Sequence, residues 1–182
     1  MNALIPLAEG CEEMEAVILI DVLRRASWEV TSASIATGPV TASRGVRLLA
    51  DTAWDDIDPM KFDALILPGG GGGAERLRND ERVLAAIRDF DRSEKLLAAV
   101  CAGPLVLQAA GVLKGRKATC YPTLAEKLTD TSWRSDRVIV DGHVVTSQGP
   151  GTAMEFAVEL IRLNQGMSEA RRIADQLLLG TD

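Results

Sequence analysis

Two short apolar runs constrain the fold most strongly, because each ends at a sequence that forces the chain to turn. Ala64–Leu67 leads into Pro68 and the five glycines Gly69–Gly73. Leu96–Val100 leads into Cys101, followed by alanine, glycine and proline. Apolar runs of this length, without polar alternation, are typical of strands that are buried on both faces of a parallel sheet. Helical patterns alternate with these strands, so the sequence predicts an α/β fold with helices on both faces of the sheet.

The remaining segments fit this arrangement. Asn79 is placed to cap a helix through residues 83–90. Thr152 and Glu155 match the capping-box spacing at the start of another apolar helix. The chain contains no internal repeat, low-complexity segment or linker-like stretch, so we expect residues 1–182 to form a single domain.

Composition and charge exclude several classes of protein. The chain has a net charge of -6, which argues against a nucleic-acid footprint, and no apolar run is long enough to span a membrane. The amino terminus lacks the features of a secretory signal, so we expect a cytoplasmic location. The three cysteines Cys11, Cys101 and Cys120 are too scattered for a disulfide framework. With His143 as the single histidine, we expect neither a metal nor a cofactor.

Cys101 lies between a predicted strand and a predicted helix. Its sulfur is therefore expected to face unpaired N–H groups and the positive end of a helix dipole, which lowers the pKa of a thiol. The arrangement parallels a nucleophile elbow, although Ala99 replaces the first glycine of that motif. The alternative is that Cys101 is a small hydrophobic residue of the core.

The glycine run Gly69–Gly73 allows several interpretations. A dinucleotide site would need an acidic residue at a later strand end, and a phosphate-binding P-loop would need Lys followed by Ser or Thr; neither is present. The functional interpretation that remains is that the N–H groups of Gly69 and Gly70 stabilise a reacting oxygen, as in an oxyanion hole. A flexible surface turn is the alternative.

Five motifs, taken together and in order, carry a family resemblance. The sequences EGCEEMEAV, LPGGGGGAERL, AAVCAGP, YPTL and TSQGPGTAMEFA resemble the ThiJ/PfpI superfamily, most closely its bacterial YajL branch, from about Leu4 to Leu178. The resemblance implies a flavodoxin-like three-layer sandwich with a mainly parallel central sheet, and a homodimer. It also implies glutathione-independent glyoxalase, deglycase, chaperone or peroxide-sensing activity.

The resemblance also implies a site. By position, Cys101 matches the reactive cysteine, Glu15 the acid that contacts it, and Gly69 and Gly70 the backbone donors opposite, with Ala102 as a further donor. An ionised Glu15 would raise the pKa of the thiol by charge repulsion. We therefore predict that Glu15 is protonated near neutral pH and titrates together with the thiol.

The sequence departs from the family at one position. Many members carry a histidine before the Pro-Thr-Leu segment, where this chain has Tyr121, which becomes a candidate substrate contact. His143 follows an Asp-Gly turn in a predicted hairpin and is expected to face solvent. A Cys-His-acid triad, and with it a peptidase, is therefore not expected. Arg44 falls where relatives place an arginine of the dimer interface.

Two functions remain open. In the first, Cys101 attacks a small 2-oxoaldehyde or its adduct with an amino group, and Glu15 moves a proton between adjacent carbons, without a cofactor. In the second, the protein is a redox-sensing chaperone whose Cys101 oxidises to sulfinic acid. Both functions use the same two residues, so the sequence does not separate them.

Overall fold

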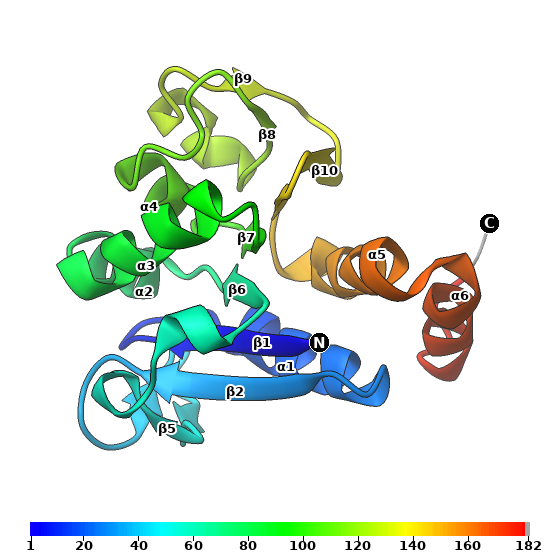
Figure 1. Ribbon diagram of the computed structural model, residues 1–182, viewed down its shortest axis with the longest axis horizontal. Helices are drawn as coiled ribbons and strands as arrows, with labels where there is room; N and C mark the ends of the chain where they lie inside the picture. Colours follow the sequence, from blue (N-terminus) through cyan, green and yellow to red (C-terminus); the bar gives the residue numbers. More distant parts are fainter. Residues whose placement is uncertain (181–182) are drawn as a thin grey trace.

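The computed structural model describes residues 1–180, and its centre is a seven-stranded sheet (Figure 1). The strand order is β10-β11-β7-β6-β1-β2-β5, and all neighbours are parallel except the antiparallel pair β10 and β11. The sheet comprises β1 (Asn2–Leu7), β2 (Glu29–Ser34), β5 (Thr52–Ala53), β6 (Ala64–Leu67), β7 (Leu96–Val100), β10 (Val138–Asp141) and β11 (Val144–Ser147). Two small pairs lie apart from it: β3 (Val40–Thr41) with β4 (Arg47–Leu48), and β8 (Lys117–Ala118) with β9 (Ser132–Trp133).

Six α-helices and four short 3-10 helices are present in residues 1–180. The α-helices are α1 (Glu13–Arg25), α2 (Gly71–Arg78), α3 (Glu81–Arg92), α4 (Pro104–Ala109), α5 (Ala153–Gln165) and α6 (Met167–Gln176). The 3-10 helices are η1 (Trp54–Asp56), η2 (Pro59–Lys61), η3 (Pro122–Lys127) and η4 (Pro150–Thr152).

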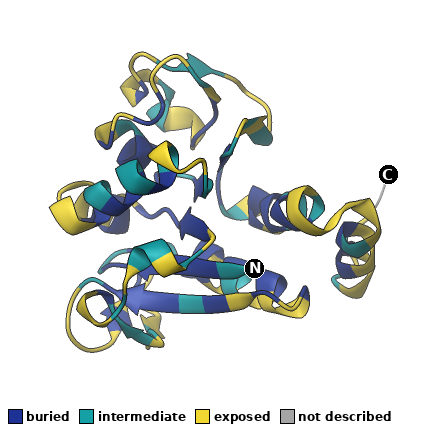
Figure 2. Ribbon diagram, in the orientation of Figure 1, coloured by how far each residue is buried: buried dark blue, intermediate teal, exposed yellow. Residues whose placement is uncertain are grey.

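Alternating side chains of the buried strands build two cores, one on each face of the sheet. On β6, Leu65 and Leu67 pack with apolar residues of α2, α3 and α4, whereas Ala64 and Ile66 pack with those of α1, α5 and α6. Figure 1 shows α2, α3 and α4 grouped on one side and α5 and α6 on the other, and Figure 2 shows the strands between them as buried. This is the predicted flavodoxin-like three-layer sandwich with a mainly parallel sheet.

The sheet has a switch point between β1 and β6. From β1 the chain passes through α1 to β2 on one side, and from β6 it passes through α2 and α3 to β7 on the other. Ligands of open α/β sheets bind in the crevice that such a reversal leaves at the carboxyl ends of the strands. Here the crevice brings the start of α1 beside the glycine run, where the Glu12 N–H donates to the Gly69 carbonyl at 3.0 Å.

Two predicted helix caps differ in the structure. Asn79 ends α2, and the side chain of Asp80 opens α3 instead by accepting from the N–H of Arg82 at 3.0 Å. Helix α5 begins after Thr152 as predicted, but the threonine side chain does not cap it. The hydroxyl of Thr152 is instead held by Ser147 and Gly149.

The β10–β11 hairpin is confirmed, but the expectation that His143 faces solvent is wrong. Its Nε2 lies 2.8 Å from Oδ1 of Asp91 on α3, and its side chain is only 16% exposed, because Asp91 draws the ring against the protein. His143 immediately precedes β11, at the amino-terminal edge of the sheet, whereas Cys101 follows the carboxyl end of β7. The single histidine is therefore no partner for Cys101.

Within residues 1–180, no helix has the length and apolar character needed to cross a bilayer.

Candidate active site

Cys101 stands at a strained corner immediately after β7. Its φ of 62° lies in the left-handed region, which residues with a side chain rarely adopt. The backbone N–H of Cys101 donates to the Ser147 carbonyl at 3.0 Å, and its carbonyl accepts from the N–H of Tyr121 at 2.9 Å. The sharp turn is as predicted, but α4 begins only at Pro104. The thiol therefore precedes the helix rather than lying in its first turn.

Glu15 approaches this corner from the first turn of α1. The side chain of Glu12 caps that helix by accepting from the Glu15 N–H at 2.7 Å. The Glu15 carboxyl is fully buried, and its Oε2 accepts from the Gly69 N–H at 2.7 Å. Its Oε1 has no hydrogen-bond partner in the described part of the chain, and Glu15 and the Cys101 thiol lie close enough to shift each other's pKa. An O–H on Oε1, pointing to the sulfur, would satisfy both groups.

Gly69 fills the space between the thiol and the acid. A Cβ at this position would lie 2.5 Å from Cys101 Cβ, 2.7 Å from Glu15 Oε2 and 2.9 Å from Ala102 N. Only glycine fits so close an approach. The prediction that Gly69 is an oxyanion donor is wrong in one respect, because its N–H is already bonded to Glu15. The N–H groups of Gly70 and Ala102 act on the thiol instead, and they favour a lower pKa of Cys101.

Burial dominates the electrostatics of the pair. It raises the pKa of Glu15 to about 7, against the opposing hydrogen bonds from Gly69 and Cys101. Burial, followed by the charge of Glu15, raises the pKa of Cys101 to about 12, and the N–H groups of Gly70 and Ala102 oppose this shift. The direction predicted for Glu15 agrees with the structure. The predicted lowering of the thiol pKa does not, because two N–H groups do not offset the loss of water and the nearby carboxylate.

Tyr121 lies at the rim of this site. Its backbone N–H donates to the Cys101 carbonyl, and the residue is 43% exposed. A Cβ at Gly149 would lie 3.2 Å from Cδ2 of Tyr121, so the ring packs directly over that glycine. This position is open to a substrate, and the contact itself remains a prediction.

Arg44 lies on the loop between β3 and β4. Its backbone N–H donates to Oε1 of buried Glu13 at 2.8 Å, and the Ser43 hydroxyl donates to Oε2 of the same carboxylate at 2.8 Å. The guanidinium of Arg44 is exposed and donates to the carbonyl of its neighbour Ser43 at 3.2 Å. Glu13 thus ties the loop to α1, and the side chain of Arg44 is left on the surface.

The sequence reasoning missed Ser147 and Thr152. Their motif, TSQGPGTAMEFA, contributed to the family resemblance, but only the structure places the Ser147 carbonyl under Cys101. No residue type in that motif signals such a backbone contact. Within residues 1–180, no cluster of three or more His, Cys, Asp or Glu is arranged to hold a metal ion.

Comparison with known proteins shows the family of this chain. The family model described as "DJ-1/PfpI family" matches residues 1–163. The chain belongs to the DJ-1/PfpI family. It is similar to Protein DJ-1 homolog B of Arabidopsis thaliana, with 42% identity over 97% of this chain, and it spans only 41% of that protein's length. A second Arabidopsis relative, Protein DJ-1 homolog A, is likewise matched over only 45% of its length.

Two further DJ-1/PfpI relatives align over nearly their whole length. Glutathione-independent glyoxalase DJR-1.2 of Caenorhabditis elegans is 35% identical over 94% of this chain and 92% of its own. The structure of oxidized Toxoplasma gondii DJ-1 superposes with a TM-score of 0.93 at 41% identity, covering 97% of each chain. The fold and the family are thus shown together.

Proposed function

We propose that the chain is a cofactor-free cysteine enzyme that acts on 2-oxoaldehydes or on their adducts with amino groups. One observation carries the proposal: a buried carboxyl with a pKa of about 7 lies beside the thiol of a strained corner residue. A carboxyl poised near neutrality is suited to both accepting and returning protons. The similarity to a relative named as a glutathione-independent glyoxalase supports the same class.

The first step makes the nucleophile. Because the pKa of Cys101 is raised, the ionised Glu15 carboxylate takes the thiol proton as Sγ bonds to the aldehyde carbon. The aldehyde π-bond breaks, and its electron pair moves to oxygen, beside the N–H groups of Gly70 and Ala102. Glu15 then gives the proton to that oxygen, which leaves a neutral hemithioacetal and a regenerated carboxylate.

The second step moves a hydrogen between neighbouring carbons. Glu15 removes the proton from the former aldehyde carbon and delivers it to the adjacent ketone carbon, while the hydroxyl proton passes to the ketone oxygen. The first carbon is thereby oxidised to a thioester, and the second is reduced to an alcohol. Water cleaves the thioester and releases a 2-hydroxy acid and the thiol. With methylglyoxal, the net reaction adds one water and forms lactate.

Lactate formation from methylglyoxal tests the scheme. Cys101→Ser should abolish turnover, and Glu15→Gln should lower kcat/KM at least about 100-fold, since general acid-base catalysis contributes that much. Cys120→Ala is the matched control, because this buried thiol lies outside the pair. Full activity in Cys101→Ser would refute the mechanism.

A redox-sensing chaperone is the second candidate. Two equivalents of peroxide would oxidise the Cys101 sulfur to sulfinic acid and release two waters. The N–H groups of Gly70 and Ala102 and a protonated Glu15 would then hydrogen-bond to the product. The similarity to a DJ-1 protein whose structure is of the oxidized form favours considering it. Intact mass after mild peroxide decides: selective gain of two oxygens at Cys101, without methylglyoxal turnover, supports sensing over catalysis.

We also propose that the chain forms a homodimer. A groove of about 1050 Å³ is lined by the apolar side chains of Met14, Ile18, Val138, Met154 and Val158, with Asp136, Arg137, Glu155 and Glu159 among its other lining residues. A second copy would cover these side chains, as the family resemblance implies. Met154→Glu should give a monomer by light scattering, and an unchanged mass would contradict the assignment.

All three cysteines are free, which suits the cytoplasmic location that we propose.

A further inference from the structure

Cys101 holds a backbone conformation that its own side chain disfavours. A residue with a positive φ persists only where its surroundings over-determine it. The backbone of Cys101 has two such partners: the Ser147 carbonyl, 3.0 Å from its nitrogen, and the Tyr121 N–H, 2.9 Å from its oxygen. What fixes Ser147 and Tyr121 therefore also fixes the corner.

Ser147 and Tyr121 are both connected to the buried hydroxyl of Thr152. Thr152 Oγ1 lies 2.7 Å from Ser147 Oγ, and both residues are buried. The same oxygen accepts from the N–H of Gly149 at 3.0 Å. Gly149 in turn lies directly under the ring of Tyr121. Thr152 is thus linked through Ser147 to the nitrogen of Cys101, and through Gly149 and Tyr121 to its oxygen.

We propose that Thr152 is a positioning residue for the nucleophile, which it reaches through Ser147 and Gly149 without touching the sulfur. Thr152 occupies the N-cap position of α5, where a threonine hydroxyl ordinarily satisfies a helix N–H. Here the hydroxyl makes no such bond. It serves the loop beneath Cys101 instead, which explains why a capping-box sequence is present without its capping bond.

The test measures how fast iodoacetamide alkylates Cys101, with peptide-level mass spectrometry to separate it from buried Cys11 and Cys120. Thr152→Val keeps the shape and removes the hydroxyl. It should slow alkylation about tenfold, since small displacements of a reacting group have effects of this order. Thr152→Ser should restore the wild-type rate.

Thr146→Val is the matched control. Thr146 lies next to Ser147 on β11 and is buried like Thr152, but its Oγ1 accepts from the Thr119 N–H at 2.9 Å. In Thr146→Val, Cys101 should be alkylated at the wild-type rate. An equal loss in both valine variants, or no loss in a folded Thr152→Val, would overturn the proposal. If Thr152→Val does not fold, Ser147→Ala removes the same hydroxyl pair from the other side and should give a loss in the same direction.

Amide hydrogen exchange gives a readout that is independent of the reaction assigned to Cys101 above. Thr152→Val should speed exchange at the Cys101 and Tyr121 amides and leave the amides of β1 unchanged. Unaltered exchange at both would contradict the positioning role even if the protein turns over methylglyoxal. Faster exchange without any methylglyoxal turnover would support the positioning role and reject only the proposed enzyme.

Discussion

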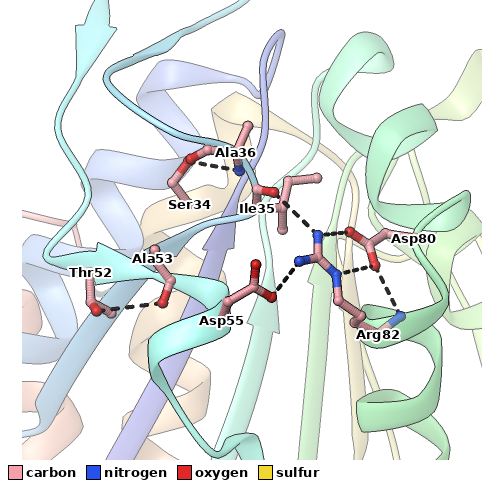
Figure 3. A network of polar contacts seen from close by, with 8 residues as sticks. All are labelled: Ser34, Ile35, Ala36, Thr52, Ala53, Asp55, Asp80 and Arg82. Carbon is pink, nitrogen blue, oxygen red and sulfur yellow. Dashed lines mark hydrogen bonds and ion pairs between the residues drawn. The ribbon is translucent and has the colours of Figure 1, made fainter.

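Two carboxyl groups near the carboxyl edge of the same sheet meet opposite environments. Asp80 opens α3 and faces Arg82, whose guanidinium also reaches Asp55 and the Ile35 carbonyl (Figure 3). The hydrogen bond from Arg82 holds the pKa of Asp80 below its usual range, although burial opposes the shift. No cation among residues 1–180 offsets the burial of Glu15, which raises its pKa to about 7.

The contrast separates an acid that stabilises the fold, Asp80, from an acid that can take part in a reaction, Glu15. Asp80 stays ionised because it pairs with Arg82, and Arg82 in turn joins α3 to Asp55 of η1 and to the Ile35 carbonyl after β2. Glu15 keeps one oxygen without a well-oriented partner and titrates near neutrality, so it can exchange a proton. Charge pairing favours a fixed protonation state, and burial without a counter-ion favours a changeable one.

The largest effect should come from closing the space around Glu15. Gly69→Ala places a methyl group 2.5 Å from Cys101 Cβ, so the thiol and the acid must separate. We expect methylglyoxal turnover to fall about 100-fold. Gly71→Ala, where a Cβ meets nothing within 4 Å, should keep its activity and gain about 0.4–1 kcal/mol in urea unfolding. Equal activity in the two variants would contradict the assigned geometry.

A smaller effect should appear in the pH dependence of stability. Folded Glu15 keeps its proton up to about pH 7, whereas the unfolded carboxyl loses it near its ordinary pKa of 4.5. Wild-type stability should therefore fall as pH rises between these values, by about 3 kcal/mol relative to Glu15→Gln. Urea unfolding at pH 4 and pH 8 measures this.

Glu13→Gln is the control for that experiment and should behave in the opposite way. Hydrogen bonds from its own backbone, Ser43 and Arg44 outweigh burial and lower the pKa of Glu13. Its stabilising contribution is present above the unfolded pKa and is lost as pH falls. If Glu15→Gln and Glu13→Gln changed with pH in the same direction, the contrast between buried acids would be wrong.

The smallest effect is expected at the paired acid. Arg82→Leu should cost about 1 kcal/mol at pH 7, because the ion pairs are partly exposed and screened. The difference from wild type should shrink as pH falls through the lowered pKa of Asp80, where the carboxylate is protonated. Alkylation of Cys101 should not change, and a slowed reaction would show that the two regions are coupled.

The buried strands and the position of the thiol were accessible from the sequence. Ala64–Leu67 and Leu96–Val100 signal a parallel sheet through their unbroken apolar character, and the turn after Cys101 follows from the glycine and proline beyond it. Pairing Glu15 with Cys101 required the family resemblance, because no local pattern links the residue after β7 to a residue on α1. The order of the strands fixes that contact.

Other features depend on which of several possible hydrogen-bond partners the fold brings close, and a sequence pattern does not show this. The N–H of Gly69 could serve a substrate or a carboxylate, and the packing of α1 assigns it to Glu15. The hydroxyl of Thr152 could cap a helix or support a loop, and in the structure it bonds to Ser147 and Gly149 of the loop. The pKa of Cys101 depends on how much water the finished fold removes, which composition does not reveal.

The corner at Cys101 is closed by Ser147, and Ser147 enters the sheet only when β11 pairs with β7. A nascent chain that ends before this strand contains the sulfur, the acid and all five glycines, yet lacks the carbonyl that holds the corner. The corner that holds the thiol is therefore completed only after synthesis has passed Ser147 and β11 has joined β7. Until then Cys101 is an ordinary exposed thiol, without the burial and the acid that define the site in the folded protein.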